Sequence, residues 1–174
     1  YGALLIIDET HTISSGLGGY SRVHSLDPDM FAVGKCVAGG MPTAVWGMRE
    51  PLADRFAAYD AARPTGHSGM GTTLSGNPMQ FACLRATLSE VMTAKNYAHM
   101  EKGAQRLAEG LDRSIEAHGA PWHVLRVGAR VEFICAQGPL RNGNEAAAAH
   151  CAPLEAALHL ALVNRGCLIA PFHN

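Results

Sequence analysis

Lys35 is the residue of this sequence best placed to do chemistry. It follows the apolar run 30–33 and precedes the glycine-rich turn 39–42. A partly buried lysine binds its proton less tightly, because burial disfavours the charged ammonium, and the neutral amine can then attack an aldehyde. The other two lysines, Lys95 and Lys102, fall on expected helix surfaces, where such charges are solvated. Lys35 is therefore a candidate nucleophile, although its spacing alone also fits a lysine that reaches solvent from a turn.

Asp8 is the second candidate, because it ends the five-residue apolar run 3–7. A continuous apolar run is typical of a strand buried on both faces in a parallel sheet. Open α/β sheets bind their ligands at the carboxyl ends of such strands. A carboxylate there could keep a pyridine nitrogen protonated, so that the ring accepts carbanion electrons; it could also form a cap or a turn. Glu9 is interpreted as a hydrogen-bonding partner rather than a catalyst.

The loop ending in residues 72–78 offers hydroxyl and backbone N–H groups just before an expected helix. Such groups at a helix N-terminus favour phosphate binding, although a loop of this composition need bind nothing. Asn77 and Pro78 predict the N-cap and the first helical residue. His67 and Ser68, in the same loop, could meet a substrate or make ordinary loop hydrogen bonds.

Strands and helices alternate around these candidates. Strands are expected at 3–7, 30–33, 44–48, 122–127 and 130–136, with a strand-like run at 167–170. Helices are expected at 52–62, about 77–94, about 96–118 and 145–164, with loops at 13–20 and 63–76. Trp46 is expected to pack in the core. The pattern predicts an α/β fold, with part of a large, mostly parallel-sheet domain over 1–99 and part of a small α+β domain over 100–174.

Composition excludes several classes of protein. Apolar residues make up 48%, which is enough for a core, and the net charge of −1 argues against nucleic acid or an anionic membrane as partner. No apolar run reaches the roughly 18 residues of a membrane span. The five cysteines form no CxxC pair, which favours free thiols and a cytoplasmic location. The chain also reads as an internal segment of a longer protein.

The order of the motifs resembles the class III aminotransferases. The matching segments are Asp8-Glu9-Thr10-His11-Thr12, Pro28-Asp29, Val33-Gly34-Lys35 and Ala38-Gly39-Gly40-Met41-Pro42. The segment 73–78 is especially similar to the glutamate-1-semialdehyde aminomutase branch of that family. The resemblance is strong over residues 1 to about 95 and looser over 100–174.

This resemblance implies pyridoxal-phosphate fold type I, with pyridoxal 5'-phosphate as cofactor. Lys35 matches the lysine that forms a Schiff base with the cofactor, and Asp8 matches the partner of its ring nitrogen. Thr10 stands where the family usually has a valine packed on the ring, and His11 occupies a variable position beside it. Thr73 matches the threonine that reaches the cofactor phosphate of the neighbouring subunit. A homodimer with shared active sites is therefore implied.

The sequence also departs from the family pattern. After Thr12 the family commonly continues Gly-Phe-Arg or Gly-Phe-Gly, whereas residues 13–15 here are Ile, Ser and Ser. A substrate contact from this loop is therefore not implied. Arg130 could hold a substrate carboxylate or pair with Glu132.

The expected activity is transfer of an amino group between an amino acid or amine and a keto acid, both small molecules. An intramolecular aminomutase or a racemase on the same scaffold is the near alternative. A non-catalytic paralogue that kept the fold is an alternative of another class, against which the presence of both Lys35 and Asp8 argues. A metal hydrolase using Asp8, His11 and His24 fits no standard ligand spacing, so no metal site is expected.

Overall fold

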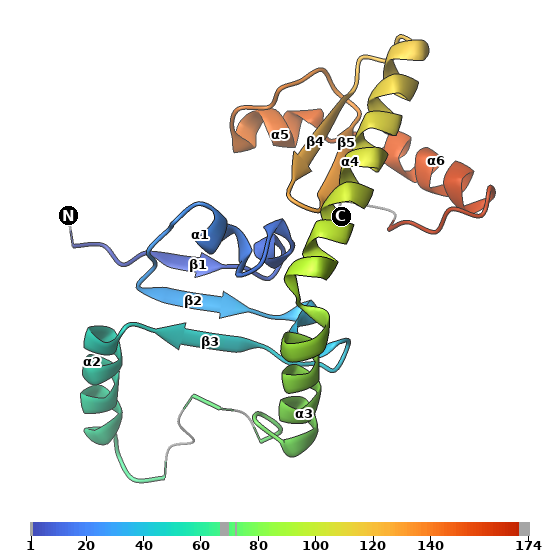
Figure 1. The fold of residues 1–174 in the computed structure, drawn as a ribbon. Helices are drawn as coiled ribbons and strands as arrows, with labels where there is room; N and C mark the ends of the chain where they lie inside the picture. Colours follow the sequence, from blue (N-terminus) through green and yellow to red (C-terminus); the bar gives the residue numbers. More distant parts are fainter. Residues whose placement is uncertain (1, 67–69, 72, 171–174) are drawn as a thin grey trace. The chain divides into compact units, whose positions relative to one another are not determined.

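The computed structural model describes residues 2–66, 70–71 and 73–170. The chain divides into two compact units, Tyr1–Met100 and Glu101–Asn174, and the long helix α4 (Ala94–Ala117) contributes to both (Figure 1). Strands and helices occur in each unit.

A three-stranded sheet forms the centre of the first unit. It consists of β1 (Ile6–Asp8), β2 (Met30–Val33) and β3 (Val45–Met48), in the order β1-β2-β3 (Figure 1). β1 and β2 are parallel, with Asp8 opposite Ala32, and β3 runs antiparallel to β2. The described sheet is thus mixed, with one pairing of each kind, where a mostly parallel sheet is expected.

The apolar run before Asp8 is less buried than its pattern predicts. Ile6 is 60% exposed, and Leu4 and Leu5 are about half exposed. The prediction of a strand buried on both faces is wrong for the described residues, where β1 lies at the edge of the sheet and pairs only with β2. The strand itself is also shorter, since it begins at Ile6.

Residues 13–20 are not the plain loop that their glycine and serine content predicts. They contain most of the 3₁₀ turn η1 (Thr12–Ser15) and the start of the short helix α1 (Gly19–Val23). The buried carboxylate of Glu9 orders this segment by accepting hydrogen bonds from it. Long-range hydrogen bonds of this kind cannot be read from local composition.

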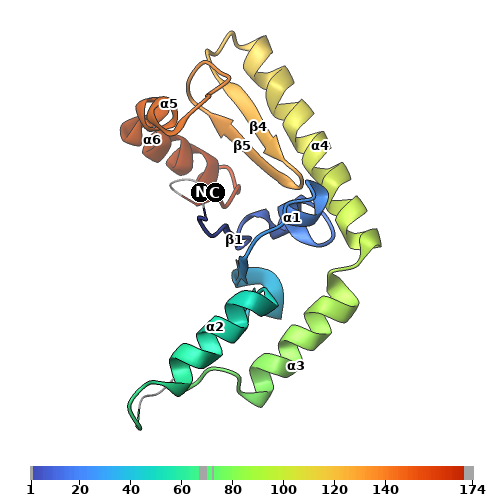
Figure 2. The ribbon, with the colours of Figure 1, turned by 90° about the vertical axis from the view of Figure 1, so that its left-hand side faces the viewer.

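The helices that flank the sheet agree well with the sequence. α2 (Glu50–Ala61) has proline in its first turn, and α3 (Pro78–Ala86) begins after Asn77. The Asn77 side chain accepts from Gln80 N at 3.0 Å, and Gln80 Oε1 accepts from Asn77 N at 3.3 Å, which makes a capping box. The predicted N-cap is therefore confirmed. Figure 2 shows α2 and α3 from the side.

The helix predicted over 77–94 is regular only as far as Ala86. It continues as a π-helical turn, η3 (Thr87–Val91), in which Met92 N donates to Thr87 O five residues earlier. Thr87 is buried, and a Cβ atom added to Gly39 would lie 3.1 Å from Thr87 Oγ1. Gly39 has a φ of +62°, so this close approach requires glycine on two counts.

The core of the first unit lies beneath the turn η2 (Lys35–Ala38). Its buried members are Ile13, Val33 and Val37, and further apolar side chains pack against them: Phe31, Leu84 and Met92. Val37 is only 2% exposed. The hydroxyl of buried Tyr97, near the start of α4, donates to Ile13 O at 3.0 Å. The turn after β2 is therefore held from below by apolar contacts.

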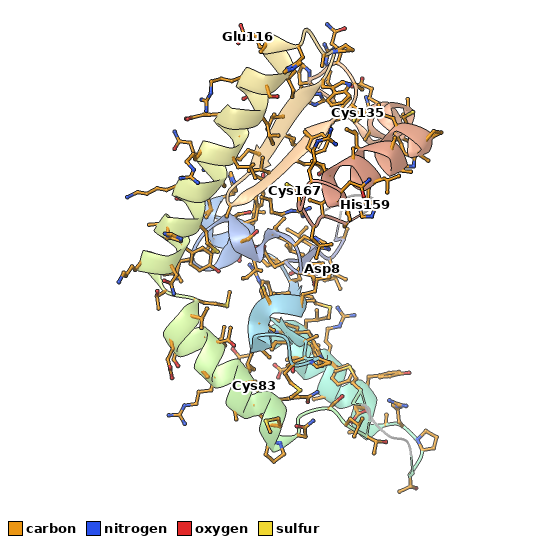
Figure 3. The ribbon with its side chains drawn as sticks, turned by 90° about the vertical axis from the view of Figure 1, so that its right-hand side faces the viewer. Asp8, Cys83, Glu116, Cys135, His159 and Cys167 are labelled. Atoms are coloured by element: carbon orange, nitrogen blue, oxygen red, sulfur yellow. The ribbon has the colours of Figure 1, made fainter. Side chains whose placement is uncertain are left out.

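The second unit contains a two-stranded antiparallel sheet and two short helices. β4 (His123–Val127) pairs with β5 (Arg130–Ile134), followed by α5 (Gly143–Ala149) and α6 (Ala152–Val163). The predicted single helix 145–164 is wrong, because a break at 150–151 precedes Pro153, which starts a new helix in its first turn. Residues 167–170 form no strand. All five cysteines are free thiols, and Figure 3 shows Cys135 and His159 in this unit.

Within the described residues, no single helix has the length and apolar composition to cross a membrane; α5 and α6 together, bent by 62°, meet these two criteria as a pair.

Candidate functional site

Asp8 and Lys35 emerge at the same edge of the sheet. Asp8 is the last residue of β1, and Lys35 follows β2 after Gly34 alone. Because β1 and β2 are parallel, their carboxyl ends meet at one edge, where open α/β sheets hold ligands. The structure therefore brings together the two residues that the sequence predicts as catalytic.

One row of paired residues defines the face of the sheet on which the site lies. Asp8 is opposite Ala32, and Ala32 is opposite Trp46. Paired residues on neighbouring strands point to the same face, and successive residues alternate between faces. Val33, the next residue on β2, is buried in the core. Asp8, Ala32 and Trp46 thus occupy the face away from the core, with the Asp8 side chain visible in Figure 3.

Lys35 has an unusual backbone conformation at the start of η2. Its φ is +55°, a left-handed value that is uncommon for residues other than glycine. Such outliers concentrate at functional sites, where the surrounding structure holds them in place. Here the buried residues Val37 and Ala38 anchor the turn. The Lys35 side chain is exposed, so the expected partial burial is wrong: the turn places Val37, and not Lys35, against the core.

His11 lies against Lys35. Nζ of Lys35 and Nε2 of His11 are hydrogen-bonded, although the residues are 24 positions apart in the chain. His11 is the residue immediately before η1, and its own carbonyl accepts from Ser14 Oγ at 3.1 Å. The residue that the sequence places beside the cofactor therefore contacts the candidate lysine directly.

The Asp8 carboxylate is held in its charged form by its neighbours. Asp8 Oδ1 accepts from Thr10 N at 2.9 Å. A hydrogen bond from the Thr10 side chain lowers the pKa of Asp8 most, followed by this backbone bond, and the positive charges of His11 and Lys35 lower it further. Burial opposes these effects but is outweighed. Asp8, Thr10, His11 and Lys35 thus form one cluster at the sheet edge.

An open hollow of about 580 Å³ adjoins this cluster. Its lining includes Lys35 and Trp46 together with residues from the turns and loops around them: Gly34, Pro42, Thr43, Ala44, Met70, Gly71, Ser75, Gly76 and Gln80. Gln80 Nε2 donates to Pro42 O at 2.9 Å, which ties α3 to the glycine-rich turn. The hollow is large enough for a cofactor or a substrate, since ligand sites typically measure roughly 300–1,000 Å³.

Trp46 is a site residue that sequence reasoning missed. It is expected in the core, but it is 47% exposed and lines the hollow next to Lys35. The cause is its register in β3, which puts it in the row of Asp8 and Ala32. The alternation of side chains within 45–48 indicates that the strand has two different faces. Only the strand pairing shows which of these faces is turned toward the core.

Thr73 is not brought to this cluster. It is exposed and does not line the hollow, although Ser75 and Gly76 from the same loop do. Its predicted contact is with a neighbouring subunit, so it stays a prediction. His67 and Ser68 lie outside the described residues. Arg130 begins β5 opposite Val127, and its proposed carboxylate contact also stays a prediction.

Glu9 supports the site from beneath. Its side chain is fully buried, and its carboxylate accepts four hydrogen bonds: from Thr12 Oγ1 at 2.5 Å, Tyr20 N at 3.1 Å, Ser21 N at 2.6 Å and Ser21 Oγ at 2.5 Å. Burial raises the pKa of Glu9, but the hydrogen bonds from Ser21, Thr12 and Tyr20 together outweigh it and leave that pKa lowered. Glu9 thus fixes the segment next to His11, which agrees with its interpretation as a hydrogen-bonding partner.

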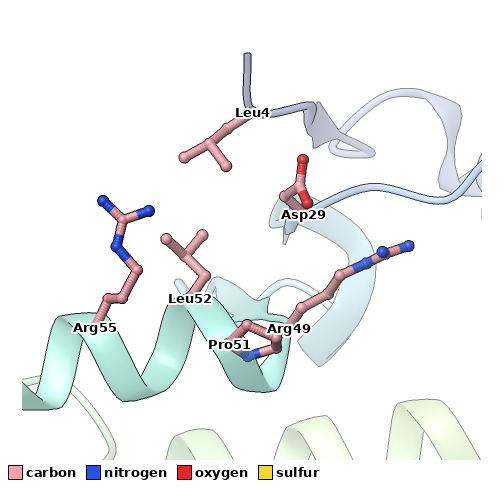
Figure 4. A pocket seen from close by; sticks show the side chains of 6 residues that line it. All are labelled: Leu4, Asp29, Arg49, Pro51, Leu52 and Arg55. Carbon is pink, nitrogen blue, oxygen red and sulfur yellow. The ribbon is translucent and has the colours of Figure 1, made fainter. Parts of the chain in front are cut away.

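A second, smaller hollow of about 110 Å³ is lined by residues before β1 and β2 and at the start of α2: Leu4, Asp29, Arg49, Pro51, Leu52 and Arg55 (Figure 4). Two of its three charged side chains, Asp29 and Arg49, already have structural partners. Asp29 Oδ2 accepts from Leu5 N at 2.8 Å, and Arg49 forms an ion pair with Asp27 and donates to Pro28 O. This hollow is therefore not a candidate site. The described residues contain no group of three or more His, Cys, Asp or Glu side chains placed to hold a metal ion.

Comparison with known proteins identifies the family. The sequence model described as "Aminotransferase class-III" matches residues 1–174. A glutamate-1-semialdehyde 2,1-aminomutase of Thermomicrobium roseum is 34% identical over 171 residues, which are 98% of this chain and 38% of the relative. The chain thus spans well under half the length of the curated relatives that it matches.

Solved structures give the same result. A glutamate-1-semialdehyde aminomutase from Pseudomonas aeruginosa PAO1 has a TM-score of 0.92 at 50% identity, covering 99% of this chain and 39% of that one. A variant of that enzyme, with a TM-score of 0.92 at 49% identity over the same shares, is in complex with PMP. A β-phenylalanine aminotransferase from Variovorax paradoxus has a TM-score of 0.82 at 26% identity, over 98% and 38% of the two chains.

These matches confirm the expected fold class, since the neighbours are pyridoxal-phosphate-dependent enzymes of fold type I. They also confirm the cofactor, because the family depends on pyridoxal 5'-phosphate. The resemblance read from Asp8, Lys35 and the glycine-rich turn is confirmed as well. The chain belongs to the class III aminotransferase family.

Proposed function

We propose that the protein to which this chain belongs is a pyridoxal-phosphate-dependent aminotransferase, which moves an amino group between an amino acid or amine and a keto acid. The observation that carries this proposal is the placement of Asp8 and Lys35 at adjoining carboxyl ends of parallel strands, with Lys35 lining a hollow. The first unit would be part of the cofactor-binding domain, and the second part of the C-terminal domain.

The residues present fit the cofactor. Pyridoxal phosphate, when bound, supplies an aldehyde that condenses with amines and a protonated ring that accepts an electron pair. The Asp8 carboxylate is charged at neutral pH, as a partner of a protonated ring nitrogen must be, and its neighbours lower its pKa further. Gly34, next to Lys35, also lines the hollow.

Each residue of the cluster then has a role that its position allows. The Lys35 amine would hold the cofactor and, when free, would move a proton at the substrate carbon. Asp8 keeps the ring nitrogen protonated, and Thr10 packs beside the ring. Thr73 reaches the phosphate of a neighbouring subunit's cofactor. The match of Thr73 to that family residue supports a homodimer.

An intramolecular aminomutase is the second candidate, and a specific observation favours it. The relatives with 34–36% identity and the solved structure with 50% identity are named glutamate-1-semialdehyde aminomutases. Assays of the full-length protein with and without an added keto acid separate the two, because a mutase needs no external acceptor. The five free thiols favour a cytoplasmic location in either case.

The central experiment replaces Lys35 in the full-length protein. The Lys35→Ala variant should lose both transamination and the absorbance band of the lysine-bound cofactor. Lys95→Ala, on the exposed surface of α4, is the matched control and should retain both. Undiminished transamination by Lys35→Ala would refute the proposal. A wild-type protein with neither cofactor absorbance nor activity would favour the non-catalytic paralogue.

A further inference from the structure

We propose that His11 is the proton acceptor of Lys35, so that the imidazole and the amine work as a pair. The proton passes from Nζ of the lysine ammonium to Nε2 of the imidazole, and the electron pair stays on Nζ. The products are a neutral amine, which is the nucleophile, and an imidazolium. This inference rests on the proposed function in one respect, namely that Lys35 is the reacting amine.

The contact itself supports a shared proton. Lys35 Nζ and His11 Nε2 are hydrogen-bonded, and both atoms are basic nitrogens. A lysine ammonium can only donate, so the imidazole nitrogen facing it must carry a lone pair. When the proton has moved, Nε2 becomes the donor and the neutral amine the acceptor. The same hydrogen bond therefore serves both protonation states, and no rearrangement is needed between them.

Both partners are held in place by the fold. On one side, the His11 carbonyl accepts from Ser14 Oγ, and buried Glu9 fixes the turn that follows. On the other side, Lys35 is held at a φ of +55° by the buried residues of η2. The meeting of the two side chains thus follows from two ordered turns at the sheet edge.

The surrounding charges allow the transfer. Asp8, at the end of β1, interacts with the positive charges of both His11 and Lys35, so its carboxylate stabilises the proton on either nitrogen. The charge of Glu9 is already satisfied by four hydrogen-bond donors. Buried Tyr97 on α4 donates its hydroxyl to Ile13 O, and Cys36 is next to Lys35 in the chain.

The test measures the reactivity of the amine without any cofactor. Cofactor-free, full-length protein is treated with formaldehyde and cyanoborohydride from pH 6 to pH 9, and methylation is followed by peptide mass spectrometry. Lys95 and Lys102 in the same digest serve as internal references. Wild-type Lys35 should react at least about tenfold faster than Lys95 at pH 7, where an imidazole is mostly neutral.

Two replacements of His11 separate proton transfer from simple positioning. His11→Gln keeps a hydrogen-bond acceptor but cannot take up a proton, and His11→Ala keeps neither property. In both variants, the ratio of the Lys35 to the Lys95 methylation rate at pH 7 should fall at least fivefold. The pH profile of that ratio should also lose the step that an imidazole causes. His99→Gln makes the same change at an exposed histidine of α4 and should leave the ratio unchanged.

The proposal is overturned if His11→Gln reacts like wild type, or if wild-type Lys35 is no faster than Lys95. The second comparison needs no variant, so it stands even if a His11 variant folds poorly. Because no cofactor is added, the result is independent of the proposed function. One outcome would reject the role of His11 and still agree with the proposed aminotransferase. In it, Lys35→Ala abolishes a normal cofactor absorbance band, whereas His11→Gln leaves the reactivity of Lys35 unchanged.

Discussion

Replacing Glu9 by glutamine should loosen the turn that carries His11 while leaving the shape of the side chain unchanged. The carboxylate is fully buried and accepts from Thr12, Tyr20 and Ser21. A glutamine can turn its carbonyl toward Ser21, but its amide NH₂ then faces the Tyr20 N–H. Two donors oppose each other there, so at least one charge-assisted hydrogen bond is lost and one backbone donor stays unsatisfied.

The size of the effect follows from these contacts. A hydrogen bond to a charged group contributes about 1.5–3 kcal/mol, and an unsatisfied buried donor costs about 1–3 kcal/mol. Because Thr12 can rotate its hydroxyl to accept from the new NH₂, we expect a net loss of about 2–4 kcal/mol in the free energy of local opening. Each 1.4 kcal/mol is a factor of ten, so the Tyr20 and Ser21 amides should exchange roughly 30- to 1,000-fold faster.

Hydrogen exchange of the full-length protein, followed by mass spectrometry of peptides covering 12–23, measures this opening directly. Glu90→Gln, at an exposed position of η3, is the matched control. The hydrogen bonds leave the pKa of Glu9 lowered, so its stabilising effect is complete above the ordinary glutamate value of about 4.3 and is lost as the pH falls through its lowered pKa. The difference between wild type and variant should therefore be constant from pH 6 to pH 8. Exchange within threefold of wild type would refute the reasoning.

Three further predictions follow from single contacts. Gly19→Ala should open the same segment, because the φ of Gly19 is +75° and the added Cβ would lie 2.8 Å from the Glu9 carboxyl group. Hydrogen exchange over 12–23 should accelerate at least tenfold, and an unchanged rate would contradict the close approach. Asn77→Ala should destabilise the start of α3 by about 1 kcal/mol through loss of its cap, seen as faster exchange of Gln80, whereas no change would show that the capping box contributes nothing. Trp46→Phe should remove most of the fluorescence change on addition of pyridoxal phosphate, because Trp46 lines the hollow. Trp122→Phe, in the second unit, should preserve that change. The opposite result would place the cofactor elsewhere.

The parts of the fold that the sequence predicts well are those with a local cause. The strand 30–33 and the cap at Asn77 depend on neighbouring residues, and both lie where they are expected. The placement of Asp8 and Lys35 at one edge of the sheet also follows from local patterns. Each residue comes after an apolar run, and parallel strands align their carboxyl ends.

The features that the sequence does not predict depend on residues far apart in the chain. Residues 13–20 are ordered by the side chain of Glu9, whose partners lie up to 12 residues away. Trp46 faces the hollow because of its pairing with Ala32, which no pattern within β3 reveals. The contact of His11 with Lys35 spans 24 positions. The break between α5 and α6 is different, since Pro153 was a local signal for it.

The π-helical turn Thr87–Val91 limits how the length of this protein can vary through evolution. Deleting one residue from it would restore a regular helix and rotate everything after it by about 100° relative to α3. Met92 would then leave the core, and Tyr97 would lose Ile13 as its acceptor. Since Ile13 belongs to the turn next to His11, such a deletion would disturb the site from a distance. Substitutions in this stretch should therefore be tolerated far better than insertions or deletions.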